Sequence, residues 1–235
     1  YLFKEIIINL ILISSIIIHM PTLVYGDENS KNNNFPQLKL YAKSAVLYDT
    51  NGKRFLYKHN SNTKMPMAST TKIMTCIIAL EYGNLEDIVD VSAYSASMPD
   101  VQLNIRKGEK YRLYDLLYSL MLESHNDVSV AIAEHIGKKI APEITDSKAA
   151  VAVFAQLMNE KAKSLNCMST NFITPNGLDA KGHYTTAEDL AIISAYAIKN
   201  KEFIKITNTS SYSFSEKNNK RRFTVNNKNS FLHRY

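Results

Sequence analysis

The tetrapeptide Ser69-Thr70-Thr71-Lys72 is followed directly by an apolar run, residues 73–80, whose length and periodicity predict a buried helix. In a helix that begins there, Ser69 and Lys72 are three residues apart and lie on one face, so the lysine nitrogen can reach the serine hydroxyl. A lysine that is desolvated by apolar neighbours can have its pKa lowered enough to remove the hydroxyl proton. The free N–H groups of the helix N-terminus favour an oxyanion. The stretch therefore predicts a serine nucleophile with a lysine base.

A second Ser-x-x-Lys, Ser61-Asn62-Thr63-Lys64, has different surroundings. It lies in a polar stretch that contains Pro66, and no apolar run follows it. Nothing there would bury the lysine or hold a helix. Context therefore selects Ser69, for which the alternative is a serine that only caps a core helix.

The triplet Ser124-His125-Asn126 lies where one predicted helix ends and the next begins. Two other Ser-x-Asn triplets, at residues 30–32 and 164–166, lie in a polar linker and at a helix end, so context again selects one copy. A junction between helices can aim Ser124 and Asn126 into a cleft. We expect His125, between them, to point away and to form no Ser-His pair, because no ordered acidic partner is evident.

The pattern as a whole predicts an α+β chain in which one antiparallel sheet packs on a block of helices. Hairpins are predicted around Asn51-Gly52 and between Tyr212 and Val225. Residues 90–106 lack a sustained period and are expected to form loops and short strands. The predicted helices, turn and capping box are a helix at 111–123, a helix at 126–137 that Gly137 stops, a helix at 147–166, a turn at 174–178 and a capping box at 185–188.

Residues 1–26 match an export signal, with Lys4 before an apolar core and Gly26 near the cleavage point. A transmembrane anchor is the alternative, although polar residues interrupt the apolar run and leave it shorter than about 20 residues. The polar residues 27–37 predict a linker, and the folded part is expected at 38–235. The formal net charge of +6 suits an anionic wall polymer or lipid surface, and the absence of a nucleic-acid motif argues against nucleic acid as partner.

Cys76 and Cys167 are the two cysteines, and neither has the spacing of a metal site. We expect no disulfide framework, no metal and no cofactor. Cys76 lies inside the apolar run after Lys72, which predicts a buried, inert thiol.

The order of these motifs resembles that of the penicillin-binding, serine-type D-alanyl-D-alanine carboxypeptidases of peptidase family S11. The resemblance extends over residues 66–75, 121–127 and 172–179, and covers roughly Leu38 to Tyr235. The Glu-Ser-His-Asn-Asp form of the second motif is similar to the branch associated with spore formation. The resemblance implies a β-lactamase/transpeptidase-like fold and an exported enzyme at the extracytoplasmic face of the cell envelope.

Specific roles follow from the resemblance. Ser69 would attack the carbonyl between the two terminal D-alanines of a peptidoglycan pentapeptide, with Lys72 as its base. Ser124 would relay a proton to the leaving amine, and Asn126 would hold the substrate amide while contacting Lys72. Water would then hydrolyse the acyl-enzyme, whereas a β-lactam antibiotic would leave the serine blocked.

The third motif of that family, Lys-Thr-Gly, does not occur in this sequence. We expect a C-terminally truncated catalytic domain with an incomplete sheet, weak or no activity, and membrane association only through the absent part. Two alternatives remain open. A β-lactamase of the same fold would need an acid that activates water, for which Glu143 and Glu160 are weak candidates; a wall-binding module would keep the cleft without using it.

Overall fold

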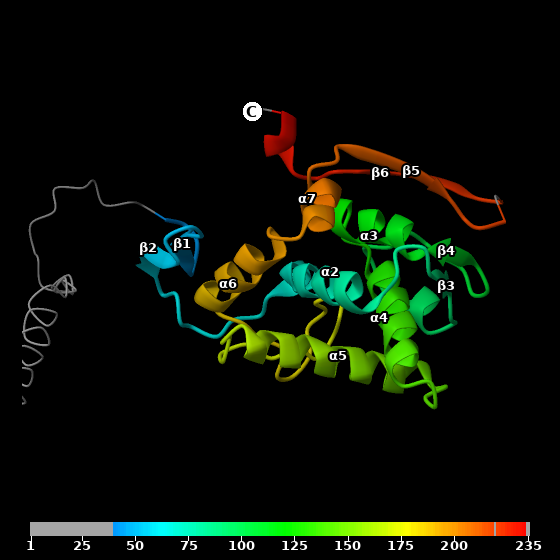
Figure 1. Cartoon of the computed structure of the whole chain (residues 1–235), viewed down its shortest axis with the longest axis horizontal. Coiled ribbons are helices and arrows are strands. Elements are labelled where there is room, and N and C mark those ends of the chain that lie inside the picture. The colour runs from blue at the N-terminus through cyan, green and yellow to red at the C-terminus, as the bar shows by residue number, and fades with distance from the viewer. Residues whose placement is uncertain (1–39, 219, 234–235) are drawn as a thin grey trace, which may run out of the picture. The chain divides into compact units, whose positions relative to one another are not determined.

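The computed structural model describes residues 40–218 and 220–233 of the chain (Figure 1). The predicted export signal, residues 1–26, and the predicted linker, residues 27–37, lie outside the described residues. All the helices and strands described below belong to the unit that begins at Ala42. Within the described part of the chain, no helix is long and apolar enough to cross a membrane.

Helix α2 (Thr71–Tyr82) contains the apolar run and is enclosed by other helices (Figure 1). Eight of its 12 residues are buried, because the run leaves no broad polar face to turn towards solvent. The predicted buried helix is confirmed, although a short 3₁₀ helix, η1 (Ala68–Thr70), precedes the α-helix. The helices in contact with α2 are α3 (Leu113–Leu122), α4 (Asn126–Ile140), α5 (Ser147–Ser164), α6 (Ala187–Ala197) and α7 (Lys201–Thr207).

Helix α4 continues to Ile140, so the prediction that Gly137 stops it is wrong. Gly137 lies where α4 crosses α5, and a Cβ at this position would overlap the backbone of Ala150. The glycine therefore permits a close approach of two helices and does not end one.

Helix α6 is capped by Thr186, one residue later than the predicted box starts. The Thr186 hydroxyl accepts a hydrogen bond from the Asp189 N–H at 3.1 Å. Thr185 instead forms a β-bridge with Met65. Glu188 accepts a hydrogen bond from the Ser61 hydroxyl at 2.6 Å, so the serine of the unselected Ser-x-x-Lys has a structural role.

The strands form three antiparallel pairs in the described residues, and the α+β class is confirmed. The two predicted hairpins are present, whereas the single predicted sheet is divided, because the β1–β2 pair packs near α6 and the β5–β6 pair packs on α3. The pairs are β1 (Ala45–Asp49) with β2 (Arg54–His59), β3 (Ile88–Asp90) with β4 (Lys110–Arg112), and β5 (Ser211–Ser215) with β6 (Arg222–Asn226).

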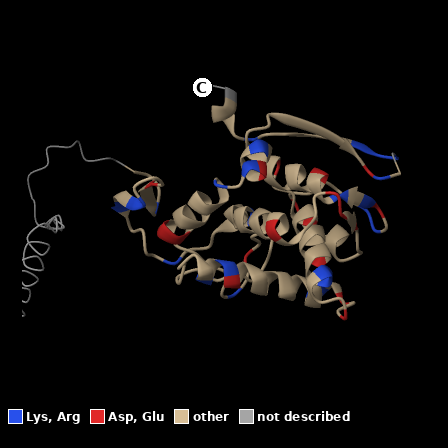
Figure 2. Ribbon diagram, in the orientation of Figure 1, with Lys and Arg blue, Asp and Glu red and all other residues tan. Residues whose placement is uncertain are grey.

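The β5–β6 hairpin lies along α3 (Figure 1) and is fastened to it by aromatic rings. The rings of Tyr118 on α3 and Tyr212 on β5 stack with centroids 3.7 Å apart and planes 7° apart. Lys and Arg residues gather at the turn of this hairpin, away from the aromatic contact (Figure 2). The stacking holds the segment that follows β6 close to the C-terminal end of α3.

Both cysteines are buried and unpaired. The prediction that Cys76 is buried is confirmed, and burial raises the pKa of its thiol to about 12, which disfavours the reactive thiolate.

Candidate active site

The side chain of Lys72 is the polar centre of the site. The residue is 2 % exposed, and its Nζ atom donates hydrogen bonds to three uncharged oxygens. These are Ser69 Oγ at 3.2 Å, Asn126 Oδ1 at 2.8 Å and the main-chain oxygen of Asn176 at 2.6 Å. The structure thus brings together two predicted residues, Ser69 and Asn126, around the predicted base.

Ser69 is exposed, although the lysine beside it is buried. It lies in η1, where Ala68 has a φ of 44°, and its side chain does not cap either helix. The alternative interpretation of Ser69 as a helix cap is therefore wrong. An accessible hydroxyl next to a buried amine is the arrangement that a nucleophile and its base require.

The environment of Lys72 favours its neutral form. Burial, and to a lesser degree the positive charge of Lys228, lower the pKa of Lys72 from 10.5 to about 8. A substantial fraction of this amine is therefore neutral near pH 8, whereas a lysine in water is almost fully charged there.

The loop between Phe172 and Leu178 supplies a partner that the sequence did not predict. The Asn176 carbonyl accepts from Lys72, and the preceding carbonyl, of Pro175, accepts from Thr75 Oγ1 at 2.6 Å and from Ser129 Oγ at 2.7 Å. These bonds tie the loop to α2 and α4. The turn was predicted, but a main-chain carbonyl carries no residue-type signal that would assign it a role.

Close packing holds the same loop against the predicted nucleophile, Ser69. Gly177 has a φ of 84°, and a Cβ there would overlap the carbonyl oxygen of Ala68, the residue before Ser69. His183 lies beneath this contact, with Nε2 2.9 Å from Thr71 Oγ1, and its Nδ1 accepts from the Ile173 N–H at 3.0 Å. The loop is therefore fixed by two contacts next to Ser69.

Ser124 and Asn126 lie at the junction of α3 and α4, as predicted. Asn126 is the first residue of α4, and its Nδ2 donates to the carbonyls of Pro99 at 3.1 Å and Asp100 at 2.9 Å. Ser124 has a φ of 67°, and its buried Oγ has no hydrogen-bond partner among the described residues. The junction thus presents one amide that is fully bonded and one hydroxyl that is unused.

His125 faces α3 and forms no hydrogen bond to Ser69 or Lys72. Its Nδ1 is 2.8 Å from Ser119 Oγ, and its Nε2 is 3.3 Å from Glu123 Oε2. The expectation that it lacks an acidic partner is wrong, because the sharp turn at Ser124 folds Glu123 back beside it. Burial lowers the pKa of His125 below its ordinary value.

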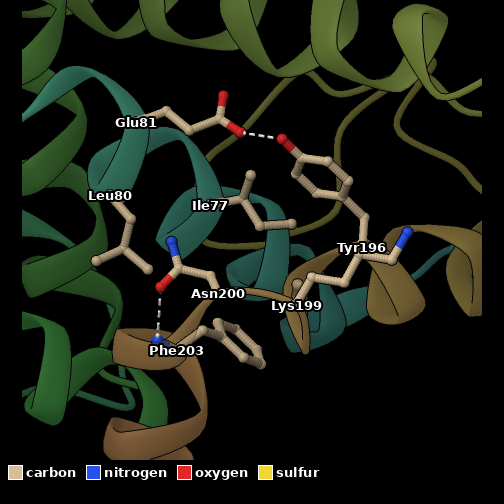
Figure 3. Close-up of a pocket in the computed structure, with 8 residues that line it drawn as sticks. Ile77, Leu80, Glu81, Tyr196, Lys199, Asn200 and Phe203 are labelled. Atoms are coloured by element: carbon tan, nitrogen blue, oxygen red, sulfur yellow. Dashed lines mark hydrogen bonds between the residues drawn. The ribbon is translucent and has the colours of Figure 1, made fainter.

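A separate pocket lies at the far end of α2 from Ser69 (Figure 3). Glu81 and Tyr196 meet across it in a 2.6 Å hydrogen bond, and Lys161 pairs with Glu81 at 2.7 Å. None of the predicted site residues lines it. Among the described residues, no group of three or more His, Cys, Asp or Glu side chains is placed to hold a metal ion.

Comparison with known proteins identifies relatives across nearly the whole chain. The family model described as D-alanyl-D-alanine carboxypeptidase, Peptidase_S11, matches residues 29–235. The D-alanyl-D-alanine carboxypeptidase DacF of Bacillus subtilis (strain 168) is 32% identical over 225 residues, which cover 94% of this chain and 54% of that protein. The D-alanyl-D-alanine carboxypeptidase of Streptomyces sp. (strain K15) is 32% identical over 164 residues, which cover 67% of this chain and 54% of that protein.

Solved structures agree with the fold. The crystal structure of the Streptomyces K15 DD-transpeptidase matches with a TM-score of 0.78 and 26% sequence identity, and the match covers 86% of this chain and 79% of that chain. The predicted transpeptidase-like fold is confirmed. The chain spans about half the length of the two curated relatives described above.

Proposed function

Because this chain belongs to the D-alanyl-D-alanine carboxypeptidase family, we propose that it is the nucleophile-bearing part of a serine carboxypeptidase that removes the terminal D-alanine from peptidoglycan stem peptides. The observation that carries the proposal is the exposed Ser69 hydroxyl, 3.2 Å from the buried amine of Lys72. Ser69 Oγ bonds to the carbonyl carbon between the two D-alanines, and the C–N bond then breaks. The terminal D-alanine leaves with the proton that the serine gave up, and water hydrolyses the remaining ester.

Lys72 has the contacts needed to take up that proton. In the neutral amine, two N–H groups donate to Asn126 Oδ1 and the Asn176 carbonyl, and the lone pair faces Ser69 Oγ. Two uncharged acceptors therefore orient the base without holding its charge. This arrangement replaces the histidine of other serine hydrolases.

Ser124 and Asn126 have different prospects at this site. The unbonded Ser124 hydroxyl is free to pass a proton to the leaving amine, as the resemblance implies. The Asn126 amide already donates to Pro99 and Asp100, so a substrate carbonyl would have to displace one of these acceptors. We assign Asn126 first to the orientation of Lys72, and its contact with substrate stays a prediction.

β-Lactams fit the same chemistry, because their strained amide presents a carbonyl to Ser69 and leaves an ester. We expect slow release of that ester, because neither acid considered for a β-lactamase is placed to activate water. Glu143 and Glu160 are both exposed, and Glu160 accepts from Gln156 on the surface of α5. No Lys-Thr-Gly occurs in the 235 residues, so we expect acylation by a reactive β-lactam but slow turnover of peptide.

The proposal places the protein at the extracytoplasmic face of the cell envelope, with peptidoglycan as its substrate. The predicted export signal and the net charge of +6, which suits anionic wall polymers, support this placement. The Glu-Ser-His-Asn-Asp motif supports a role in spore formation.

Labelling with a fluorescent penicillin tests the function. The chain is incubated with the reagent and denatured, and the covalent label is measured by gel and intact mass. We expect label on the wild type and none on Ser69→Ala, with Ser61→Ala as a matched control from the other Ser-x-x-Lys that keeps its label. An unlabelled wild type would refute the assignment of Ser69 as nucleophile and would favour a wall-binding module, which forms no ester. Rapid loss of the label would favour a β-lactamase.

A further inference from the structure

The hydroxyl of Ser124 is held in place by its neighbours and not by bonds of its own. Its Oγ is buried and unpaired, and its backbone has the left-handed φ of 67° that side chains other than glycine rarely adopt. A strained residue persists only where the surrounding structure over-determines it. The residues on either side of Ser124 must therefore supply the restraint.

On the α4 side, the restraint comes from the first turn of the helix. The Asn126 N–H donates to the Val101 carbonyl at 2.7 Å. Asp127 accepts from the N–H groups of Leu103 at 3.0 Å and Ile105 at 3.1 Å. These bonds fix the start of α4 but do not reach Glu123.

On the α3 side, the carboxylate of Glu123 makes two contacts. Oε1 accepts from the N–H of Asn226, at the end of β6, at 2.8 Å, and Oε2 lies 3.3 Å from His125 Nε2. The other ring nitrogen of His125 is 2.8 Å from Ser119 Oγ, one turn back in α3. The carboxylate thus links the residues before and after Ser124 to each other and to β6.

The segment after β6 closes the same turn from outside. The N–H of Lys228 donates to the Leu122 carbonyl at 3.2 Å, and its Nζ donates to the Glu123 carbonyl at 3.1 Å. These two carbonyls are in the last residues before Ser124 and would otherwise lack helical partners.

We propose that Glu123 and His125 are positioning residues that hold the Ser124 hydroxyl ready for proton transfer, and that the segment Asn226–Lys228 braces them. The inference rests on the proposed function, because only that reaction requires Ser124 to pass a proton. In this arrangement the His125 ring is neutral, with its proton on Nε2 facing Glu123 and Nδ1 accepting from Ser119. Burial lowers the pKa of His125, which agrees with a neutral ring.

The test compares Glu123→Gln with wild type in the rate of acylation by fluorescent penicillin. Glutamine keeps the shape of the side chain, but its single oxygen can accept from only one of the two N–H groups, and its own NH₂ opposes the other. We expect the first-order acylation constant to fall about tenfold, with the penicillin concentration for half-maximal rate unchanged. A fold that is merely destabilised would lower the labelled fraction and leave this constant alone.

Three further variants complete the comparison: one control, and two that close a double-mutant cycle. Glu86→Gln, at a glutamate whose side chain is 70% exposed and pairs with Arg112, is the matched control and should acylate like wild type. Ser124→Ala should be slow, and adding Glu123→Gln to it should cost less than twofold further. A full tenfold effect of Glu123→Gln in the Ser124→Ala background would overturn the proposal, as would an unchanged rate in the single variant.

A readout independent of activity separates this inference from the function itself. Nitrogen-15 NMR of the wild-type imidazole at neutral pH should show the His125 proton on Nε2. A proton on Nδ1 would overturn the proposed hydrogen bond from His125 to Glu123. If the wild type takes up no penicillin, the proposed function fails whatever the tautomer is.

Discussion

Gly177→Ala adds one methyl group where the loop between Phe172 and Leu178 approaches the backbone before Ser69, the proposed nucleophile. A Cβ at this position would overlap the Ala68 carbonyl oxygen and lie 2.9 Å from Thr71 Oγ1. The oxygen belongs to the backbone directly before Ser69, so it cannot rotate away by itself. To reach ordinary contact, the η1 turn or the loop must move by about 1.5 Å.

Two costs contribute to the loss of stability. A left-handed φ costs an alanine about 1–2 kcal/mol, of which reduced freedom in the unfolded chain offsets a part. Overpacking against backbone adds about 1–3 kcal/mol. The total of about 3 kcal/mol would lower the midpoint of thermal unfolding by about 6–12 °C for a chain of this size. A shift of about 1 Å at Ser69 would slow acylation by about 100-fold.

Gly108→Ala is the matched control for backbone strain. Gly108 has a φ of 86°, close to that of Gly177, but a Cβ there meets no atom within 4 Å. We expect this variant to lose about 1 kcal/mol and to acylate at the wild-type rate. Thermal unfolding and penicillin acylation are measured on all three proteins. The reasoning is refuted if both alanine variants lose the same stability and keep the same rate.

Three other expectations concern Lys72, the proposed base, and the loop that contacts it. The acylation rate should rise with pH to a plateau above the Lys72 pKa of about 8. The free energy of unfolding should rise by about 3 kcal/mol between this pH and 10.5, because the unfolded chain keeps a proton there that the folded chain has lost. A free energy of unfolding in urea that did not change across this range would contradict the expectation. Asn126→Asp puts a carboxylate where an uncharged oxygen lies 2.8 Å from Lys72 Nζ, which should raise the pKa of Lys72. The midpoint of the acylation rate against pH should therefore lie at least about one pH unit higher than in Asn126→Ala. Equal midpoints in the two variants would argue against this effect. Thr75→Val and Ser129→Ala should each cost about 1 kcal/mol in urea unfolding, whereas together they should cost more than the sum, because the Pro175 carbonyl then loses both donors; strict additivity would show that another group satisfies it.

Local periodicity was enough to predict much of the fold. The run after Lys72 predicted α2, and Asn51-Gly52 predicted the β1–β2 turn, because both signals lie within a few residues. Gly137 was misassigned because its reason is a neighbouring helix, and nothing near it in sequence reveals Ala150. The capping threonine was misplaced by one residue because Thr185 is engaged by Met65, far away along the chain.

The sequence could predict those parts of the candidate site that are formed by side chains, because only side chains differ from one residue type to another. Ser69 and Lys72 follow from helical spacing, and Ser124 and Asn126 from their place at a junction. The Asn176 carbonyl could not be predicted, because any residue offers one. Glu123 was missed as the partner of His125 because the left-handed turn at Ser124 brings the two side chains together. The residues around a serine do not indicate that its backbone will adopt a left-handed φ.

The distribution of acids around Lys72 is compatible with its proposed role as the base. Two carboxylates, Glu123 and Asp127, lie one and three residues from Ser124, and either would raise the pKa of Lys72 if it paired with the amine. Neither does so: Asp127 accepts from backbone N–H groups of Leu103 and Ile105, and Glu123 is engaged by Asn226 and His125. The hydrogen bonds that shape the junction therefore also keep both negative charges away from the Lys72 amine. Burial then lowers the pKa of Lys72 unopposed, so the geometry of the α3–α4 turn and the basicity of the amine depend on the same contacts.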